Sequence, residues 1–390
     1  MDTQNTPIHI NLWHNDFWKL TLANLLLSVS VYMLMVGIPF NMIANDYSRW
    51  QVGMVMGVFG IGIFLFGGFM SRWVQVHRRN RVCQLAILGV IISIAGLYYQ
   101  DTTPANRLDY YIYLGLRLFM GACYGLATMV MTSTLIIDIC ESFQRTEANH
   151  ATAWFSRMAM SIGPVVGFAI LHKLDYNTLL VVAIGCAVAS LFLMSLVKFP
   201  FKAPGENLSI FSLDRFFLPN AIPLFLVTML VTATMGLMFS TITTTSFYGM
   251  LMVGFLLALL AERFVFVNAE LKSEAISGLI AISSAFLLLL FHPDSMAYRI
   301  APVLTGFGLG IIGSRFLLFF IKLSKHCQRG SSQSMFFLAW EFGIALGLFG
   351  GYSILSSTRL ILLVGVSFAV ITLIIYNFIL HPWYMKNKNR

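Results

Sequence analysis

Charged residues are scarce in this chain of 390 residues: Asp, Glu, Lys and Arg make up 11% of it, whereas 58% is hydrophobic. Soluble domains carry about a quarter charged residues, and the mean hydropathy of +0.80 lies on the same apolar side. The apolar residues fall in segments of about twenty, the length that a helix needs to cross a bilayer core without water to satisfy its backbone. The composition therefore excludes an ordinary soluble protein and predicts an all-α membrane protein.

Sequence signatures of catalysis are also missing. The chain has no His-Glu-x-x-His zinc motif, no Walker loop and no dinucleotide-binding glycine fingerprint. Its five cysteines are scattered over separate segments and show no metal-binding or redox spacing; they are Cys83, Cys123, Cys140, Cys186 and Cys327. We therefore expect packing cysteines, no metal, no cofactor and no enzymatic activity.

Glycine, proline and charge clusters divide the chain into twelve predicted transmembrane helices. They cover 17–40, 50–73, 82–100, 109–137, 150–171, 178–197, 217–243, 246–266, 272–291, 298–321, 332–355 and 359–381. An even number of spans places both termini on one side of the membrane.

Basic residues indicate which side that is. Most of the 25 Lys and Arg residues lie in connections on the side of the termini, and the opposite side has only Arg49, Arg107, Lys173, Arg299 and Arg359. By the positive-inside rule both termini are predicted to be cytoplasmic, in the cell's inner membrane. The net charge of +9 then reflects topology and attraction to anionic lipid headgroups, and we expect no nucleic-acid partner.

The longest predicted cytoplasmic connection divides the spans into two sets of six. We therefore predict a six-helix bundle at 1–198, a linker at 199–216 and a second bundle at 217–390. Two weak internal alignments support a repeat. Ser71–Val76 aligns with Glu262–Val267, and the segment that starts at Gln144-Arg145 aligns with the one that starts at Gln328-Arg329.

Small residues at short helical intervals predict places where helices approach closely. They are Gly53, Gly57 and Gly60 in the second span, Gly163, Pro164 and Gly167 in the fifth, and Gly343, Gly347 and Gly351 in the eleventh. We interpret these rows as packing surfaces, along which the two halves would slide if they rock against each other.

Three segments carry motif-like patterns. The loop after the second span reads Gly68-Phe69-Met70-Ser71-Arg72 and then Arg78-Arg79-Asn80-Arg81, and Glu262-Arg263 stands at the equivalent place in the second half. The fourth span contains Arg117-Leu118-Phe119-Met120-Gly121, and the fifth contains Gly163-Pro164-Val165-Val166-Gly167.

With twelve spans in two sets of six, these patterns resemble the major facilitator superfamily over the whole chain. The Gly-Pro-x-x-Gly pattern is similar to that of its drug and sugar efflux branches, which resemble proton antiporters. Ser71 stands where the family has an aspartate, and Ala159 and Phe168 replace glycines that flank the fifth-span motif. The resemblance implies two pseudo-symmetric six-helix bundles around a central cavity that opens to one side of the membrane at a time.

One carboxylate, Glu341, is predicted to lie near the middle of a span, and we expect no other to do so. An ionisable group there costs about 2.5–3.5 kcal/mol on insertion scales, so it needs a partner or a wet cavity. Because a carboxyl group removed from water favours its protonated form, we predict that Glu341 couples a proton to transport. A fixed ion pair or a structural hydrogen bond is the alternative. Arg157 occupies the equivalent repeat position, so it is predicted either to pair with Glu341 or to contact substrate.

In the resembled family, the first and fourth spans of each half line the cavity. We therefore expect substrate contacts on one face of each of these helices, with ordinary helix packing as the alternative for any one residue. For Arg117 that alternative is a bond to backbone carbonyls. The expected cavity residues are Arg117, Arg157, Asn24, Ser28, Tyr32, Tyr124, Thr128, Thr228, Thr232 and Phe239.

Charges at the predicted cytoplasmic side suggest a latch. Asp138 ends the fourth span within reach of the basic cluster after the second, and such a pair would break when that side opens; a solvated surface charge is the alternative. The expected latch residues are Arg72, Arg78, Arg81, Asp138, Glu262 and Arg263. Arg315, inside the tenth span, is expected to extend to the membrane interface.

These observations predict a monomeric secondary transporter that exports a small amphipathic organic solute in exchange for protons. Export rests on the Gly-Pro-x-x-Gly pattern alone. One alternative is uptake of a nutrient or organic anion by symport or facilitated diffusion, with the anion held by Arg117 or Arg157. An alternative of another class is a polytopic membrane enzyme or receptor. The expected partners are the solute, protons and the lipid bilayer.

Overall fold

A computed structural model describes residues 11–102, 109–199, 209–325, 328–355 and 357–389. Within these ranges every regular element is a helix and no strand occurs. Eleven helices are long and apolar enough to cross a membrane, and one bent pair of helices makes a twelfth span. The expected all-α membrane fold is confirmed.

The twelve spans follow one another with short connections. The first six are α1 (Asn15–Ala44), the bent pair α2 (Arg49–Gly62) and α3 (Gly67–Val76), α4 (Arg79–Thr102), α5 (Asp109–Val130) continued by η1 (Met131–Leu135) and α6 (Ile136–Asp138), α7 (Arg145–Lys173), and α8 (Tyr176–Ser195). The last six are η2 (Pro219–Ala221) with α9 (Ile222–Thr241), α10 (Thr245–Phe264), α11 (Leu271–Phe291), α12 (Ala297–Leu323), α13 (Arg329–Phe349) with η4 (Gly350–Ile354), and α14 (Thr358–Ile375) with η5 (Tyr376–Leu380) and α15 (His381–Asn387).

The span predicted over 50–73 consists of two helices. α2 ends at Gly62, α3 begins at Gly67, and the two helices are bent by 43°. Glycine is a weak helix former. Gly62 also lies so close to α5 that a Cβ atom there would stand 2.4 Å from the Leu118 carbonyl oxygen. The bend therefore lies where the second span packs closely on α5.

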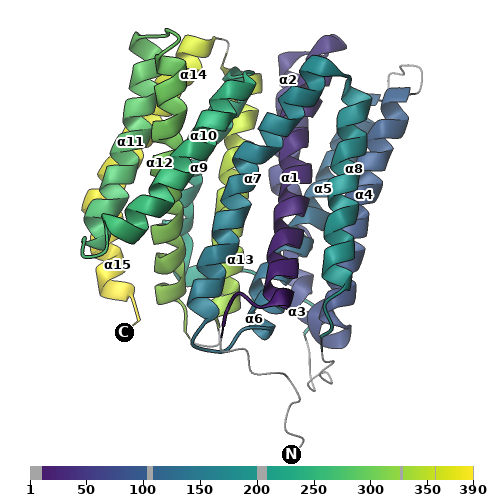
Figure 1. The fold of residues 1–390 in the computed structure, drawn as a ribbon, viewed down its shortest axis with the longest axis vertical. Helices are drawn as coiled ribbons and strands as arrows, with labels where there is room; N and C mark the ends of the chain where they lie inside the picture. The colour runs from purple at the N-terminus through teal and green to yellow at the C-terminus, as the bar shows by residue number, and fades with distance from the viewer. Residues whose placement is uncertain (1–10, 103–108, 200–208, 326–327, 356, 390) are drawn as a thin grey trace, which may run out of the picture.

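Contacts between helices sort the twelve spans into two groups. In the first group α1 packs on α7 and α8, and α5 packs on α2 and α4. In the second group α9 packs on α13 and α14, and α12 packs on α10 and α11. Figure 1 shows the first group on the right and the second on the left. The domain boundaries at 1–198, 199–216 and 217–390 stay predictions, and residues 200–208 lie outside the described residues.

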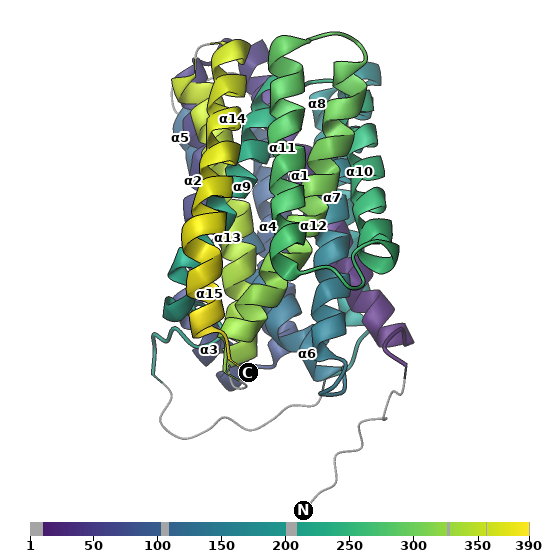
Figure 2. The same ribbon diagram turned by 90° about the vertical axis from the view of Figure 1, so that its left-hand side faces the viewer.

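The two ends of the described chain lie at the same end of the bundle. The start of α1 and the end of α15 are both at the bottom of Figures 1 and 2. We call this end the terminal face and the opposite end the far face. An even number of spans requires this arrangement.

The two groups meet most extensively along two helix pairs, α2 with α13 and η4, and α7 with α10. Smaller contacts join α13 to η1 and α7 to α12. A Cβ atom on Gly53 would lie 2.6 Å from the Ser353 side chain, and one on Gly60 would lie 2.6 Å from that of Ala345. In the other pair, the Ser161 hydroxyl donates to the Tyr248 carbonyl oxygen. These contacts hold the groups together on the side of the far face.

The glycine rows of the fifth and eleventh spans lie inside the groups. A Cβ atom on Gly163 would stand 2.6 Å from Cβ of Tyr32 in α1, and one on Gly347 would stand 2.1 Å from the Ala233 carbonyl oxygen in α9. The same two seams include Gly167 after Pro164 in α7, and Gly343 and Gly351 beside α9. The interpretation of these rows as sliding surfaces between the halves is therefore wrong for α7 and α13. It fits only the row in α2.

The described end of the connection between the groups, residues 209–218, contacts both of them at the terminal face. The backbone N–H of Ser212 donates to the Gly68 carbonyl oxygen in α3 over 2.9 Å. The backbone of Arg215 is bonded to α13, with its N–H 2.8 Å from Ser331 Oγ and its carbonyl oxygen 2.7 Å from Ser334 Oγ. This segment therefore connects α3 and α13 directly.

Candidate functional site

A hydrogen bond to a carboxylate joins the two groups at the centre of the bundle. The Tyr32 hydroxyl of α1 donates to Oε1 of Glu341 in α13 over 2.9 Å. Tyr32 is 1% exposed and Glu341 is 3% exposed, so the bond is shielded from solvent. The other carboxylate oxygen, Oε2, has no hydrogen-bond partner among the described residues.

Glu341 lines a small cavity between the groups. The cavity has a volume of about 30 Å³, which is the share of one water molecule in the liquid. It is lined by Tyr32, Thr128, Thr132, Ala153, Ser156, Arg157, Gln333, Phe336, Phe337, Trp340 and Glu341. A drug-sized solute needs several hundred Å³, so it fits here only after the groups separate.

Arg157 lines the same cavity but does not form an ion pair with Glu341 in the described structure. Its Nη1 atom donates to the Gly310 carbonyl oxygen over 2.6 Å and to Ser314 Oγ over 3.0 Å, both in α12. The guanidinium carbon of Arg157 lies 4.3 Å from the Trp154 ring centroid. The predicted pairing of Arg157 with Glu341 is therefore wrong. Nη2 of Arg157 has no partner among the described residues, so it is available to a ligand.

Polar residues of α1 bond to neighbouring helices beside this cavity. Asn24 Nδ2 donates to Ser156 Oγ over 2.7 Å, and the Tyr124 hydroxyl donates to Ser28 Oγ over 3.2 Å. Thr128 is 2% exposed, and no described residue is a hydrogen-bond partner of its Oγ1. The predicted faces of the first and fourth spans thus meet, and Tyr32 and Thr128 reach the cavity itself.

Four aromatic rings form a continuous stack next to Glu341. Tyr32 stacks on Phe239 at 6.3 Å between centroids, Phe239 on Tyr248 at 5.4 Å, and Tyr248 on Phe168 at 5.8 Å. The rings come from α1, α9, α10 and α7, so the stack crosses from one group to the other. Phe239 was expected at the cavity, whereas Phe168 and Tyr248 were not identified from the sequence. Tyr32 lines the cavity, whereas Phe239 is not among its lining residues.

The two threonines predicted on the seventh span serve helix packing. Thr228 Oγ1 donates to the Leu224 carbonyl oxygen of its own helix over 2.7 Å. Thr232 Oγ1 donates to the Thr228 carbonyl oxygen over 3.1 Å and faces Gly343 of α13. Neither residue lines the central cavity.

Arg117 is fully buried but lies away from the central cavity. Its guanidinium carbon stands 4.4 Å from the Phe59 ring centroid in α2, and Nη1 lies 3.3 Å from Met120 Sδ. Its Nε and Nη2 atoms have no partner within the described ranges. None of the described hydrogen bonds joins Arg117 to a backbone carbonyl, so the alternative role expected for it is not observed.

The predicted latch takes a different form. Asp138 forms an ion pair with Arg79, and among the described ion pairs none includes Arg72, Arg78 or Arg81. Both partners belong to the first group, in α6 and α4, so this pair does not bridge the two groups. In the second group Glu262 is half-buried and Arg263 is exposed.

A second buried carboxylate was not identified from the sequence. Glu274, in the first turn of α11, is 1% exposed and forms an ion pair with Arg315 of α12. Glu274 lies near the end of its span and not near the middle, so it does not contradict the prediction for Glu341. Arg315, which was expected to extend to the membrane interface, instead pairs within the bundle. The signal available in the sequence was Arg315 itself, because an arginine inside a span requires a partner.

Comparisons with known proteins agree with this architecture. A family model described as Major Facilitator Superfamily matches residues 20–348. No match to a curated protein sequence is found.

Three solved transporters have a similar structure. The nucleoside transporter NupG has a TM-score of 0.68 and 13% identity, covering 93% of this chain and 98% of that one. The human organic anion transporter MFSD10 has a TM-score of 0.68 and 14% identity, covering 92% and 98%. A bacterial homolog of the human lysosomal transporter Spinster, inward-facing and unoccupied, has a TM-score of 0.70 and 12% identity, covering 96% and 98%. At these identities the likeness shows the fold alone.

Proposed function

Because this chain belongs to the major facilitator superfamily and is a transporter rather than an enzyme, we propose that it exports a small, amphipathic organic solute in exchange for protons. In this proposal the protein is a monomer in the cell's inner membrane, and its terminal face is cytoplasmic. The excess of Lys and Arg in the connections at that face supports this orientation. The direction of transport is supported by the Gly163-Pro164-Val165-Val166-Gly167 segment in α7.

The hydrogen bond from Tyr32 to Glu341 is the observation that carries the proposal. Glu341 lies where the two groups meet, its described partner is a neutral hydroxyl, and no described cation is paired with it. A charged carboxylate is costly at this depth, and protonation removes the charge. Glu341 is therefore suited to take up and release a proton.

Protonation of Glu341 changes how strongly the groups are held together. A hydrogen bond to an ionised carboxylate is roughly twice as strong as one between neutral groups. When Glu341 is protonated, α1 and α13 therefore separate more easily and the cavity widens. When the proton leaves, Tyr32 bonds the carboxylate again. In the proposed exchange, the solute contacts Glu341 only while its carboxylate is charged. A proton that arrives from the other side of the membrane then neutralises the carboxylate and displaces the solute.

The lining of the cavity supports an amphipathic solute. Phe336, Phe337 and Trp340 supply apolar and aromatic surface, whereas Ser156 and Gln333 supply hydrogen-bonding groups. Gln333 is 3% exposed, and its Oε1 has no partner among the described residues. A solute with one apolar face and a few polar atoms satisfies both kinds of surface.

Uptake or exchange of an organic anion is the second candidate function. The observation that favours it is the unpartnered Nη2 of Arg157 beside the same cavity. A guanidinium group binds carboxylate or phosphate oxygens with paired hydrogen bonds. The described fold similarity to a human organic anion transporter is compatible with this candidate and does not select it.

Transport in proteoliposomes tests the coupling. The vesicles contain a pH-sensitive dye, and a panel of nucleosides, organic anions and fluorescent amphipathic dyes is offered under an imposed pH gradient. We expect at least one solute to move with a proton flux in the opposite direction. Glu341→Gln should abolish the proton flux, because the amide cannot carry the proton, while solute exchange without a gradient persists.

The matched control makes the same Glu-to-Gln change at a position away from the central cavity. Glu147 is exposed in the first turn of α7, so Glu147→Gln should transport as the unaltered protein does. Proton flux that is unchanged in Glu341→Gln contradicts the coupling role of Glu341. Flux of an anion in the same direction as the protons supports the second candidate.

A further inference from the structure

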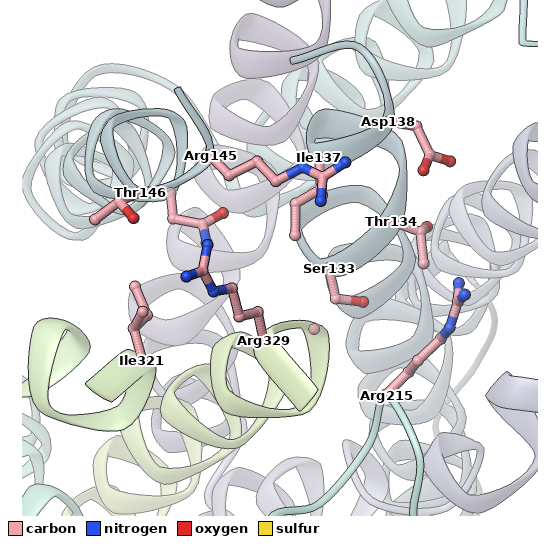
Figure 3. Close-up of a pocket in the computed structure, with 11 residues that line it drawn as sticks. Ser133, Thr134, Ile137, Asp138, Arg145, Thr146, Arg215, Ile321 and Arg329 are labelled. Atoms are coloured by element: carbon pink, nitrogen blue, oxygen red, sulfur yellow. The ribbon is translucent and has the colours of Figure 1, made fainter. Parts of the chain in front are cut away.

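A second hollow opens between the groups at the terminal face, and we call it the vestibule. Its volume is about 200 Å³, larger than that of the central cavity. It is lined by Ser133, Thr134, Ile137, Asp138, Arg145, Thr146, Asn149, Arg215, Ile321, Arg329 and Gly330. Figure 3 shows the side chains of Arg145, Arg215 and Arg329 arranged around Ser133 and Thr134.

The same two helices line both hollows. α7 contributes Arg145 and Asn149 to the vestibule and Arg157 to the central cavity, and α13 contributes Arg329 to the vestibule and Glu341 to the central cavity. At 1.5 Å per residue the two levels are separated by about 18 Å along either helix. The vestibule therefore lies on the direct route between the terminal face and Glu341.

Positive charge in the vestibule exceeds the negative charge available to balance it. Asp138 is paired with Arg79, and Arg215 lies 3.9 Å from Asp214. Arg145 and Arg329 have no acidic partner among the described ion pairs. Burial lowers the pKa of the Arg215 guanidinium, and the charge of Arg79 lowers it further. Two arginines, one from each group, thus face the same hollow without a counterion from the described residues.

Other donors point to the same kind of ligand. Arg145 begins α7 and Arg329 begins α13, so the first turns of both helices contribute backbone N–H groups and positive helix-end charge. Nε of Arg145 is buried and has no hydrogen-bond partner among the described residues, so this donor is left for a ligand in the vestibule. The Ser133 hydroxyl is already bonded to the Met129 carbonyl oxygen over 2.6 Å. The groups left for a ligand are therefore mainly arginine donors.

We propose that the vestibule binds an oxyanion, a carboxylate or phosphate group, between Arg145 and Arg329. The anion neutralises two like charges that belong to different groups, and it therefore holds the terminal ends of the groups together. Binding itself does not depend on the proposed transport function. An anionic solute on its way to or from the central cavity and a phospholipid headgroup carry the same chemistry, and the experiment distinguishes them.

Binding of inorganic phosphate and of citrate to the purified full chain tests the site. Calorimetric titration in a non-ionic detergent at constant ionic strength, with chloride as the reference anion, should give a saturable signal. Loss of one charge-assisted contact weakens binding by about tenfold or more, so Arg145→Gln and Arg329→Gln should each do so. Arg78→Gln removes an exposed charge at the terminal face and should leave the affinity unchanged.

Two further variants separate loss of binding from loss of fold. Arg145→Lys and Arg329→Lys keep the charge and should bind more weakly than the unaltered chain but more tightly than the Gln variants. Glu341→Gln should bind the anion normally, so failure of the coupling proposal does not affect this result. In nanodiscs, phosphate binding that is lost when phosphatidylglycerol is added identifies a lipid headgroup as the natural occupant. Absence of a saturable signal in detergent, or equal affinity in both Gln variants and the unaltered chain, overturns the proposal.

Discussion

Contacts inside each group of helices and contacts between the two groups are built differently. Inside a group, the ion pair of Glu274 with Arg315 joins α11 to α12, and backbone approaches backbone where Gly347 meets α9. Between the groups, a neutral hydroxyl donates to Glu341, and Arg157 of α7 donates to the Gly310 carbonyl oxygen of α12. The row of glycines in α2 meets mostly side chains there. The ion pair and the backbone seam inside a group are expensive to break, whereas the bond from Tyr32 to Glu341 and the glycine row of α2 are cheaper to open and close.

The two buried carboxylates show the same difference. Glu274 faces a guanidinium, which stabilises its charge and makes removal of either partner costly. Glu341 faces Tyr32, and one of its oxygens has no partner among the described residues. A structural role follows for Glu274 and a switching role for Glu341. The predictions below compare the two kinds of contact by their effect on the free energy of unfolding in detergent and on transport.

The largest loss of stability is expected from Arg315→Met. This change leaves Glu274 buried without its cation, which costs about 3–5 kcal/mol of unfolding free energy. Thermal or denaturant unfolding in detergent measures it. The double variant Arg315→Met with Glu274→Gln removes both charges and should recover most of the loss. A single variant that unfolds like the unaltered protein would show that the pair does not stabilise the second group.

Gly347→Ala should have the next largest effect. The new Cβ would stand 2.1 Å from the Ala233 carbonyl oxygen, so α13 and α9 must move apart. Overpacking of this kind costs about 1–3 kcal/mol. Gly350→Ala is a matched control three residues away, because no atom lies within 4 Å of its new Cβ. Equal unfolding free energies for the two variants would contradict a close seam inside the group.

Tyr32→Phe tests the central contact between the groups. Loss of a hydrogen bond to a charged group is worth about 1.5–3 kcal/mol, but the groups separate during transport, so we expect most of that change in the balance between open and closed states. Global unfolding should change by less than for Arg315→Met. Accessibility of a cysteine placed at Ser156 to a thiol reagent from the terminal face should rise. If the cysteine at Ser156 is no more accessible and proton-coupled flux is unchanged, Tyr32 does not control the opening of the groups.

The smallest change in stability is expected from Gly60→Ala. Its Cβ would stand 2.6 Å from the Ala345 side chain, and that contact can open by separation of the groups at the far face. We expect less than about 1 kcal/mol of lost unfolding free energy. Transport should slow, and a cysteine at Ser353 should become more reactive from the far face. A loss of stability as large as that of Gly347→Ala would erase the distinction between the two kinds of seam.

Much of the site could be predicted residue by residue. Helical spacing places Tyr32 and Ser28 on one face of the first span and Tyr124 and Thr128 on one face of the fourth, and the family resemblance implied that both faces line a cavity. Tyr124 does bond to Ser28, and Tyr32 and Thr128 do line the central cavity. Glu341 was predicted as the central ionisable group because charge inside an apolar segment is visible in the sequence. Its functional role stays a prediction.

Other features of the site could not be predicted from one-dimensional spacing. The repeat places Arg157 and Glu341 at equivalent positions, but equivalence under a pseudo-two-fold axis does not mean contact, and Arg157 bonds to α12 instead. Glu274 lies two residues inside a predicted span boundary, and the sequence analysis did not single it out. The bend of the second span depends on how closely Gly62 approaches α5, which no property of the second span reveals.

The sequence by itself determined that the chain is a bundle of membrane helices and which of its residues are too polar for lipid, because hydropathy and charge act locally along each helix. Only the tertiary structure decided which polar groups face each other. It paired Glu274 with Arg315, Glu341 with Tyr32 and Asp138 with Arg79, and it brought Arg145 and Arg329 to one vestibule. Partner choice depends on the packing of helices far apart in the chain, and hydropathy does not encode that packing.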